Sequence, residues 1–337
     1  MVGEKAMQSV LVTGGNGFLG SHICQSLVER GYDVSSIDIA PYKWRDEFAD
    51  FVESGRLRLL EGDIADERFV FSVIDRARPE IVIHLASVVG VGRYIQDPMR
   101  VIEINLFGLR NILRSIKGSG ARIVFASTSE VYGKNPEVPW IEESDRVLGP
   151  TGVSRWSYST SKAAAEHMIW ACSGPYGLDA VVVRYFNLYG PRQKPELLVP
   201  AQILRALTGG ELLVYDGGNQ TRCFTYVDDA VSGTCAAAFS PHAPGLTFNI
   251  GSPVETSVLQ VSRMIGEMSG NGGYIIREVS SGEIYGDAYE DIPRRVPDTR
   301  RVAGVLGWEA STPLREGLLK TIQWWRDQID GAGPLTY

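Results

Sequence analysis

The sequence contains few cysteines and no long apolar run, and these shortages exclude several classes of protein. Its 337 residues include only four cysteines, Cys24, Cys172, Cys223 and Cys235. They are scattered and form no Cys-x-x-Cys pair, so we expect reduced thiols, not a disulfide framework or a zinc site. No stretch of about 18 apolar residues occurs, so we expect no membrane span. The short polar segment 1–8 does not resemble a secretory signal, and we expect a cytoplasmic protein.

Positive charge is also scarce. The 33 Lys and Arg residues against 40 Asp and Glu residues give a formal net charge of −7. This balance argues against a nucleic-acid partner, which usually meets a basic face, but it allows a local basic pocket for a phosphate. The apolar share of 44% and the charged share of 22% are ordinary for a globular chain and exclude intrinsic disorder. The length predicts one large unit or two intimate subdomains.

Strand and helix patterns alternate through the first half of the chain. Runs such as "IVIHLA" and "AVVVRYF" are apolar on both sides, which is typical of parallel strands covered by helices on both faces. The pattern predicts a doubly wound, Rossmann-like α/β fold. The expected strands are Ser9–Thr13, Asp33–Ile39, Leu57–Leu60, Ile81–Leu85, Ile123–Ala126 and Ala180–Tyr185, and the expected helices are Gly17–Glu29, Glu67–Ala77, Met99–Lys117 and Ser157–Ala171.

The composition of the chain changes after about Asn187, where prolines and paired glycines become frequent. We expect residues 1–187 to form the first domain, which also takes back part of 221–250. Residues 188–337 then form a smaller α/β lobe over the carboxyl ends of the strands, where open α/β sheets bind ligands. The helices expected in this half are Val199–Leu207, Asp228–Phe239, Val258–Met268 and Leu314–Asp327.

A glycine-rich loop lies between the first strand and the first helix. In "VLVTGGNGFLGSHI", Gly15, Gly17 and Gly20 have Gly-x-Gly-x-x-Gly spacing, and Gly14 gives a second such spacing. Glycines allow a tight turn and a close approach of the backbone to a pyrophosphate at the helix N-terminus. Asp38 ends the second strand, where a carboxylate accepts from a ribose 2′-hydroxyl and repels a 2′-phosphate. The pattern therefore predicts NAD, not NADP; the alternative is a structural turn beside a charged strand end.

Tyr158 and Lys162 stand four residues apart in "RWSYSTSKAAAEH". On a helix this spacing puts both side chains on one face. An ammonium beside a phenol stabilises the phenolate and so lowers the phenol pKa. Such a phenol can take a proton from a hydroxyl while a hydride leaves the same carbon. The pair predicts a dehydrogenase-type catalytic couple.

Together, these motifs resemble the extended short-chain dehydrogenase/reductase family of nucleotide-sugar epimerases, dehydratases and decarboxylases. The segments that carry the resemblance are "TGGNGFLG", "HLAS", "STSEVYG", "YSTSK", "RYFNLYGPR" and "RCFTYVDDA", and the match runs from Val10 to about Trp325. The resemblance implies that Asn105 is a bracing amide. It also implies a homodimer in which the helices Met99–Lys117 and Ser157–Ala171 pair with their copies. His84, inside an apolar strand, is expected to be a core residue.

The resemblance also assigns binding residues. A cofactor site for NAD is implied at Gly14, Gly17, Phe18, Leu19, Gly20, Asp38, Asp63, Ile64, Leu85, Ala86, Ser87, Tyr158 and Lys162. A nucleotide-sugar site, with a UDP-sugar as the expected partner, is implied at Arg93, Thr128, Asn187, Arg192, Val214, Tyr215, Arg222 and Arg295.

The segment "FASTSEVYG" is similar to UDP-glucuronate decarboxylases, including the decarboxylase domain of the bifunctional polymyxin-resistance enzyme. By this resemblance Thr128, Ser129 and Glu130 are catalytic, in place of the Asp-Glu pair of dehydratases. In "PRRVPD", Arg295 matches the arginine that acts on the departing carboxyl group, and Arg294 is its neighbour. The expected reaction is oxidation at C4 of UDP-glucuronate and loss of CO₂ from the 4-keto acid, without a metal.

One segment favours a different outcome. "SVVGVGRYIQDP" resembles the loop of UDP-glucuronate 4-epimerases, with Arg93 placed to bind a carboxylate, although those enzymes usually have serine where Glu130 stands. The alternatives are therefore a 4-epimerase or dehydratase, and a non-catalytic NAD-binding regulator. The presence of Thr128, Tyr158 and Lys162 argues against the regulator.

Overall fold

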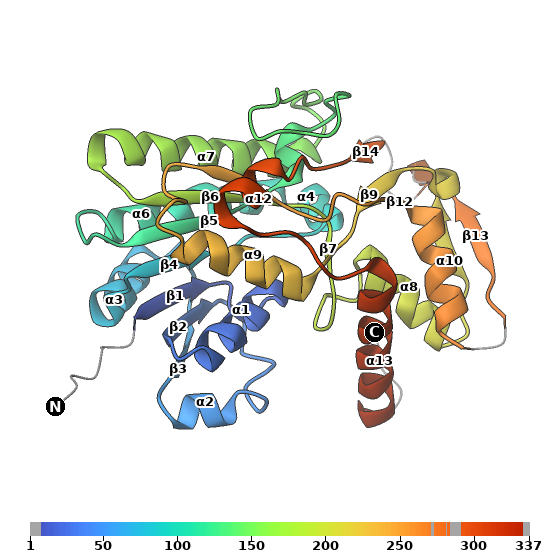
Figure 1. Cartoon of the computed structure of the whole chain (residues 1–337), viewed down its shortest axis with the longest axis horizontal. Coiled ribbons are helices and arrows are strands. Elements are labelled where there is room, and N and C mark those ends of the chain that lie inside the picture. The colour runs from blue at the N-terminus through green and yellow to red at the C-terminus, as the bar shows by residue number, and fades with distance from the viewer. Residues whose placement is uncertain (1–7, 271–272, 281, 284–290, 333–337) are drawn as a thin grey trace.

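The computed structural model describes residues 8–270, 273–280, 282–283 and 291–332. Its centre is a seven-stranded sheet in the order β11-β6-β5-β4-β1-β2-β3, with every neighbouring pair parallel (Figure 1). This confirms the predicted doubly wound α/β fold. The strands are β1 (Ser9–Thr13), β2 (Asp33–Asp38), β3 (Leu57–Glu61), β4 (Ile81–His84), β5 (Arg122–Thr128), β6 (Ala180–Tyr185) and β11 (Thr247–Ile250).

Helices cover both faces of this sheet (Figure 1). Val10 and Val12 of β1 belong to the core shared with helices α1 and α9, whereas Leu11 belongs to the core under α3, α6 and α7. All three side chains are fully buried, and burying each contributes about 1.5–3 kcal/mol. The helices are α1 (Phe18–Glu29), α3 (Glu67–Ala77), α6 (Leu109–Ser115), α7 (Trp156–Tyr176) and α9 (Val227–Phe239).

The helix predicted for Met99–Lys117 is interrupted by a π-helical turn. The structure has α5 (Pro98–Glu103), then the π turn η1 (Ile104–Gly108), then α6. A π turn inserts one extra residue into a helix and so rotates the side chains on either side. Apolar spacing alone does not indicate it. Two short helices, α2 (Ala49–Glu53) and α4 (Val91–Gln96), were also not predicted.

The second lobe lies beyond the carboxyl ends of the strands (Figure 1). Helix α12 (Arg300–Leu306) packs against β11 of the main sheet. The lobe itself holds α8 (Leu198–Leu207), α10 (Val258–Met268) and α13 (Leu314–Ala332). Its small sheets are β10-β7, β12-β9-β14 and β13-β8. Their strands are β7 (Leu188–Tyr189), β8 (Leu212–Tyr215), β9 (Thr221–Cys223), β10 (Thr225–Tyr226), β12 (Glu255–Ser257), β13 (Ile276–Val279) and β14 (Arg294–Arg295).

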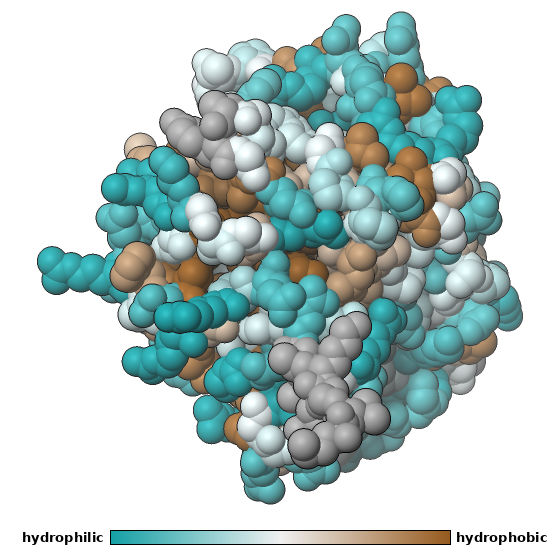
Figure 2. Space-filling model, turned by 60° about the vertical axis from the view of Figure 1, so that its left-hand side comes forward, coloured by the Kyte–Doolittle hydropathy of each residue, from teal (hydrophilic) through white to brown (hydrophobic). Residues whose placement is uncertain are grey.

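Between these elements the chain returns to the main sheet. Helix α9 packs against β5 and β6, and β11 adds the strand next to β6. The surface of the molecule in the view of Figure 2 is mostly hydrophilic, with hydrophobic residues in small separate groups. None of the helices in the described ranges has the length and apolar character needed to cross a membrane.

Candidate active site

The glycine loop packs tightly against the segment that follows β4. Gly14 has a positive φ of 77°, and a Cβ added to it would lie 2.9 Å from the backbone nitrogen of Ala86. A Cβ on Gly20 would lie 2.1 Å from the carbonyl oxygen of Gly14. Helix α1 begins at Phe18, with Gly17 as its N-cap, and presents unpaired N–H groups at its first turn. These close approaches form a cradle that fits a pyrophosphate.

Asp38 ends β2 beside this loop. Its carboxylate accepts hydrogen bonds from the backbone N–H groups of Asn16, at 3.0 Å, and Ala40, at 3.1 Å. The Asn16 side chain donates to the Pro41 carbonyl and accepts from the Lys43 N–H. Asn16 was not singled out from the sequence, yet it ties the glycine loop to the loop after β2. The position of Asp38 suits a ribose hydroxyl.

The predicted adenine-side residues are held by a second set of contacts. The Asp63 carboxylate accepts from the Ala65 N–H and forms an ion pair with Arg100 at 2.6 Å. Ile64 is buried and fills the space beside Gly108 of the π turn. The Asn111 side chain donates to the Ile64 carbonyl. Asp63 and Ile64 therefore lie in a braced segment at the end of β3.

The π turn directs Asn105 toward two serines. The Asn105 Oδ1 accepts from Ser87 Oγ at 2.7 Å, and its Nδ2 donates to Ser161 Oγ at 2.9 Å. Ser161 lies on α7, one turn after Tyr158. Leu85 and Ala86 donate through their backbone N–H groups to the carbonyl and hydroxyl of Thr13. Asn105 thus holds the segment after β4 against the helix that carries the catalytic couple.

Tyr158 and Lys162 are both buried. Lys162 Nζ donates to the Ala126 carbonyl at 2.8 Å, and burial lowers the pKa of Lys162 to about 7 against the opposing charge of Glu166. Burial raises the pKa of Tyr158, and the charge of Glu130 raises it further. This direction is opposite to the one expected from the sequence, because desolvation of the buried phenol is the largest effect on its pKa.

The Tyr158 hydroxyl has three polar neighbours that oppose this rise. Hydrogen bonding with Ser87, Thr128 and Tyr94 lowers the pKa of the phenol. The Tyr94 ring stacks on the Tyr158 ring, with centroids 4.5 Å apart and an interplanar angle of 5°. Tyr94 was not identified from the sequence, since its helix α4 was not predicted. The structure therefore adds a second buried phenol to the site.

Glu130 lies between two arginines. It follows Thr128, whose Oγ1 accepts from the Glu130 N–H, and the buried Ser129 in the 3-10 turn η2 (Ser129–Tyr132). Its carboxylate pairs with Arg155 at 2.9 Å and Arg295 at 3.2 Å. Burial alone would raise the pKa of Glu130, but the two positive charges outweigh it and lower the pKa to about 2. Glu130 is therefore a permanent anion near neutral pH.

Arg155 was missed in the sequence, where only its position three residues before Tyr158 distinguishes it. It caps the start of α7 and is fully buried. Arg295 is also buried, and its Nε has no hydrogen-bond partner among the described residues. Arg294, in contrast, has a side chain that is 55% exposed and pairs with Glu255. The structure thus distinguishes the two adjacent arginines.

The predicted nucleotide-sugar residues come from several elements. The register of β9 and β14 places Arg222 opposite Arg295, and Arg222 pairs with Asp291 at 2.7 Å. Asn187 has a positive φ of 26° and a buried Oδ1 with no hydrogen-bond partner among the described residues. Val214 and Tyr215 end β8, the former buried and the latter partly exposed. Asn187 therefore presents an acceptor that suits a ligand.

Arg192 has contacts that do not by themselves indicate a substrate residue. Its guanidinium pairs with Glu47 at 2.6 Å and lies over the rings of Trp44 and Phe48. These partners belong to the loop between β2 and α2, on the cofactor side. Its Nη1 is nevertheless buried without a hydrogen-bond partner in the described part of the chain. Arg93 falls in α4, and its side chain lies outside the described residues.

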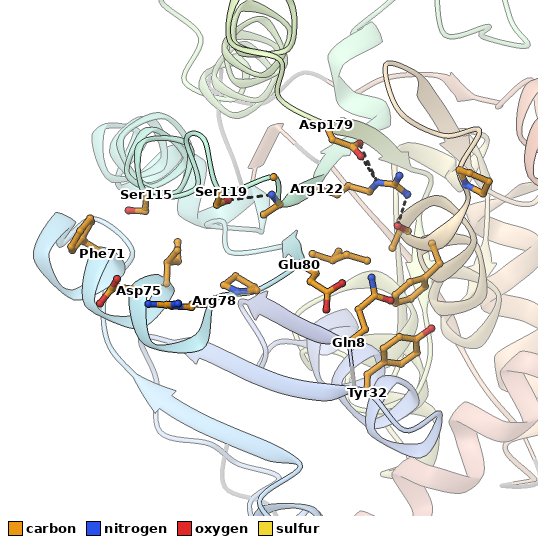
Figure 3. Close-up of a pocket in the computed structure, with 18 residues that line it drawn as sticks. Gln8, Tyr32, Phe71, Asp75, Arg78, Glu80, Ser115, Ser119, Arg122 and Asp179 are labelled. Carbon is orange, nitrogen blue, oxygen red and sulfur yellow. Dashed lines mark hydrogen bonds and ion pairs between the residues drawn. The ribbon is translucent and has the colours of Figure 1, made fainter. Parts of the chain in front are cut away.

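A separate hollow of about 910 Å³ lies at the opposite edge of the sheet (Figure 3). Gln8, Glu80, Arg122 and Asp179 line it, and they stand at or next to the amino ends of strands. Arg122 there pairs with Asp179. Since the predicted site residues lie at the carboxyl ends, this hollow is not part of their site.

The four cysteines are free, and His84 is buried, with its Nδ1 2.8 Å from Thr13 Oγ1. Over the described ranges, no three His, Cys, Asp or Glu side chains are grouped so that they could hold a metal ion.

Comparison with known proteins gives consistent relatives. Residues 10–251 match the NAD dependent epimerase/dehydratase family. The chain is 37% identical over 322 residues to a UDP-N-acetyl-alpha-D-glucosaminuronate decarboxylase of Bacillus cytotoxicus, covering 94% of this chain and 97% of that protein. It is 37% identical over 335 residues to UDP-glucuronic acid decarboxylase 1 of Xenopus tropicalis, covering 97% of this chain and 74% of that protein.

Solved structures with the same fold include two epimerases. A UDP-glucuronic acid 4-epimerase from Bacillus cereus, in complex with UDP-glucuronic acid and NAD, has a TM-score of 0.84 at 25% identity and covers 95% of this chain and 99% of that one. A UDP-glucose 4-epimerase from Thermotoga maritima, with UDP-glucose, has a TM-score of 0.82 at 29% identity and covers 95% and 99%.

Proposed function

Because the chain belongs to the NAD dependent epimerase/dehydratase family, and is thus an NAD-dependent enzyme, we propose that it is a UDP-glucuronate decarboxylase. It oxidises C4 of the sugar and removes CO₂ from the resulting 4-keto acid, which makes it a lyase. The product is a UDP-pentose, either UDP-xylose or the UDP-4-keto-pentose. The observation that carries this proposal is the Glu130 carboxylate held between Arg155 and Arg295.

NAD fits the residues of the cradle. Gly14, Gly17 and Gly20 leave the room that a pyrophosphate needs, the start of α1 faces it, and Asp38 suits the adenosine ribose. When bound, NAD supplies the acceptor for the hydride that leaves C4. In its phenolate form, Tyr158 would take the proton of the C4 hydroxyl, with Thr128 as the hydrogen-bond neighbour of its oxygen.

The charges around Glu130 suit the second step. Arg155 and Arg295 both face the Glu130 carboxylate, and the Arg295 guanidinium can also hold the carboxylate of the uronate. Arg295 offers its unpaired Nε for this contact. After oxidation the carboxyl group is β to a ketone, so the C–C bond can break with its electrons passing into the enolate. A proton from water or a side chain then completes C5.

The ionised state of Glu130 defines its role. A carboxylate with a pKa of about 2 carries no proton to donate at neutral pH. It can accept hydrogen bonds and repel a neighbouring carboxylate, which favours release of CO₂. The serine usual at this position in 4-epimerases has no such charge, and this difference favours decarboxylation over epimerisation.

The reaction is tested by incubating the purified protein with NAD⁺ and UDP-glucuronate and determining the molecular mass of the product by mass spectrometry. UDP-N-acetylglucosaminuronate, the substrate named for one relative, is the parallel substrate because it has the same C4 hydroxyl and C5 carboxylate. A product lighter by CO₂ supports the proposal. An unchanged mass with inverted C4 overturns it in favour of the 4-epimerase, whose solved relative shares this fold. No turnover with either substrate also contradicts it.

We further propose a homodimer in which α5, η1, α6 and α7 pair with their copies. Met99 and Phe107 support this, because they are 62% and 49% exposed on that layer.

The four free cysteines support a reducing compartment, the cytoplasm. We assign residues 1–187, with part of 221–250, to cofactor binding and 188–337 to the nucleotide sugar. Arg93, Arg192, Arg222, Val214 and Tyr215 stay predicted contacts of that sugar nucleotide.

A further inference from the structure

A buried network of polar side chains lies behind the pair formed by Glu130 and Arg295. Its members come from four elements: Glu166 of α7, Arg184 of β6, Tyr132 of η2 and Asn249 of β11. Each of the four is at least nine-tenths buried. None of them takes part in the proposed chemistry, so their presence in the core needs a different explanation.

One end of the network is anchored to the main sheet. Arg184 donates to both carboxylate oxygens of Glu166, at 3.0 and 2.6 Å, and Ser127 also donates to Glu166. The Arg184 Nη1 donates to the Tyr132 hydroxyl at 2.9 Å and to the Glu142 carbonyl at 2.7 Å. Tyr132 is therefore fixed to β6 and α7 through its hydroxyl.

The other end reaches the segment that follows Arg295. The Tyr132 hydroxyl donates to Asn249 Oδ1 at 2.7 Å. Asn249 Nδ2 donates to the carbonyls of Trp140, at 2.9 Å, and Asp298, at 3.3 Å. Trp140 in turn exchanges backbone hydrogen bonds with Val296 and Asp298. The hydrogen bond between Tyr132 and Asn249 thus connects the turn that carries Glu130 to the strand that carries Arg295.

We propose that Tyr132 is a positioning residue which, through Asn249, holds Arg295 against Glu130 at the spacing that loss of CO₂ requires. Tyr132 stands two residues after Glu130 in one 3-10 turn, and Asp298 stands three residues after Arg295. The two charged groups come from distant parts of the chain, and the link through Tyr132 and Asn249 adds to the pairing of β14 with β9 in fixing the strand of Arg295 relative to the turn of Glu130. This inference rests on the proposed decarboxylase function.

The energetics support a role in positioning, not in stability. Well-packed apolar side chains of similar size often stabilise a core as much as a buried ionic network does. The network instead restricts its members to one arrangement, because each buried polar group must keep its partner. Burial raises the pKa of Tyr132 to about 12, against the opposing charge of Arg184, so the hydroxyl keeps the proton that it donates to Asn249.

The test is Tyr132→Phe in the full chain, under single-turnover conditions with carboxyl-labelled UDP-glucuronate. The ring keeps its stacking on Trp140, whose centroid lies 4.9 Å away, so the variant loses only the hydroxyl. We expect NADH to form at the wild-type rate while release of labelled CO₂ slows about tenfold. NADH should therefore accumulate to a higher transient level than in the wild type.

A matched control is Tyr185→Phe. Its hydroxyl, 2.7 Å from Thr234 Oγ1, is also hydrogen-bonded but contacts α9 on the other face of the sheet, and Tyr185 is partly buried. This control should leave the ratio of the two rates unchanged. Asn249→Leu removes the same hydrogen bond from the other partner and should give the same ratio of NADH formation to CO₂ release as Tyr132→Phe. If one of the two variants fails to fold, the other still tests the inference.

Coupling to Arg295 separates positioning from a general structural defect. In an Arg295→Met background, Tyr132→Phe should slow CO₂ release no further, because the group that it positions is gone. Additive losses, or equal slowing of NADH formation and CO₂ release, would overturn the inference alone. A wild-type enzyme that releases no CO₂ would overturn the proposed function, and the inference with it.

Discussion

Tyr158 lies one helical turn before Lys162 on α7, and its hydroxyl contacts both Ser87 and Thr128. We expect Tyr158→Phe to slow NADH formation about 10²–10⁴-fold, because the acceptor of the C4 proton is removed. NAD binding should persist, since the cradle is formed by other residues. Stopped-flow absorbance and a cofactor titration measure the two quantities. Undiminished NADH formation would exclude Tyr158 as the base.

Arg295 and Arg294 form a natural matched pair. Arg295→Met should slow CO₂ release about 10²–10³-fold, because a charged contact to the carboxylate is lost, while C4 oxidation continues. Arg294→Met should behave as the wild type, since Arg294 is exposed and contacts Glu255. NADH would then accumulate beside an intact uronate in the first variant only. Equal behaviour of the two variants would contradict the assignment.

Lys162 gives the stability of the protein a pH dependence. Burial lowers its pKa from 10.5 to about 7, so the folded state favours the neutral amine. The folded protein therefore gains stability from this group as pH rises through about 7 toward 10.5, and loses it as pH falls. Without cofactor, Lys162→Met should be more stable than the wild type below pH 7, and its advantage should shrink above it. Denaturant unfolding of both proteins across this pH range measures the difference. A stability advantage of Lys162→Met that grows above pH 7 would contradict the prediction.

At the scale of elements, the contact between α1 and the glycine loop depends on Gly20. A methyl group there would meet the Gly14 carbonyl at 2.1 Å, so Gly20→Ala must push the helix from the loop. We expect a loss of about 1–3 kcal/mol in stability and at least tenfold weaker NAD binding. Gly304→Ala in α12, where a Cβ meets nothing within 4 Å, should instead stabilise by about 0.5–1 kcal/mol. Calorimetry of both variants checks the contrast.

Much of this arrangement could be predicted from local sequence. Apolar runs indicated the six strands from β1 to β6, and the glycine spacing located the start of α1 within one residue. The π turn η1 and the helix α4 could not be predicted, because both depend on contacts with distant elements. Asn105, for example, meets Ser161 only when the sheet has formed. Tyr94 was missed for the same reason.

The two arginines that pair with Glu130 could also be predicted only in part. Glu130 and Arg295 were named from family resemblance, but Arg155 has no local signal, and its role depends on the packing of α7 against η2. The pKa of Tyr158 was expected in the wrong direction, since the spacing of Tyr158 and Lys162 gives the partner charge but not the burial. Tertiary desolvation, which sequence spacing does not contain, decides that sign.

At the scale of the whole molecule, the proposed dimer depends on the exposed side chains of η1 and α5. Phe107→Glu should shift the protein toward monomers, because a charge would be buried where two copies meet. Leu319→Glu, at a 51% exposed position of α13 in the other lobe, is the matched control and should leave the mass unchanged. Light scattering at micromolar concentration distinguishes them. A wild type that is already monomeric would refute the dimer.

The position of β11 also affects how the chain is made. Phe248 and Ile250 complete the core beside β6, yet a ribosome releases them only after the segment from β7 to α9, which contains the first part of the second lobe. Until then β6 is an open strand edge, and such edges pair with other nascent chains. Ribosomes stalled between β6 and β11 would therefore carry the aggregation-prone form, and chaperone binding should be concentrated in that interval of synthesis.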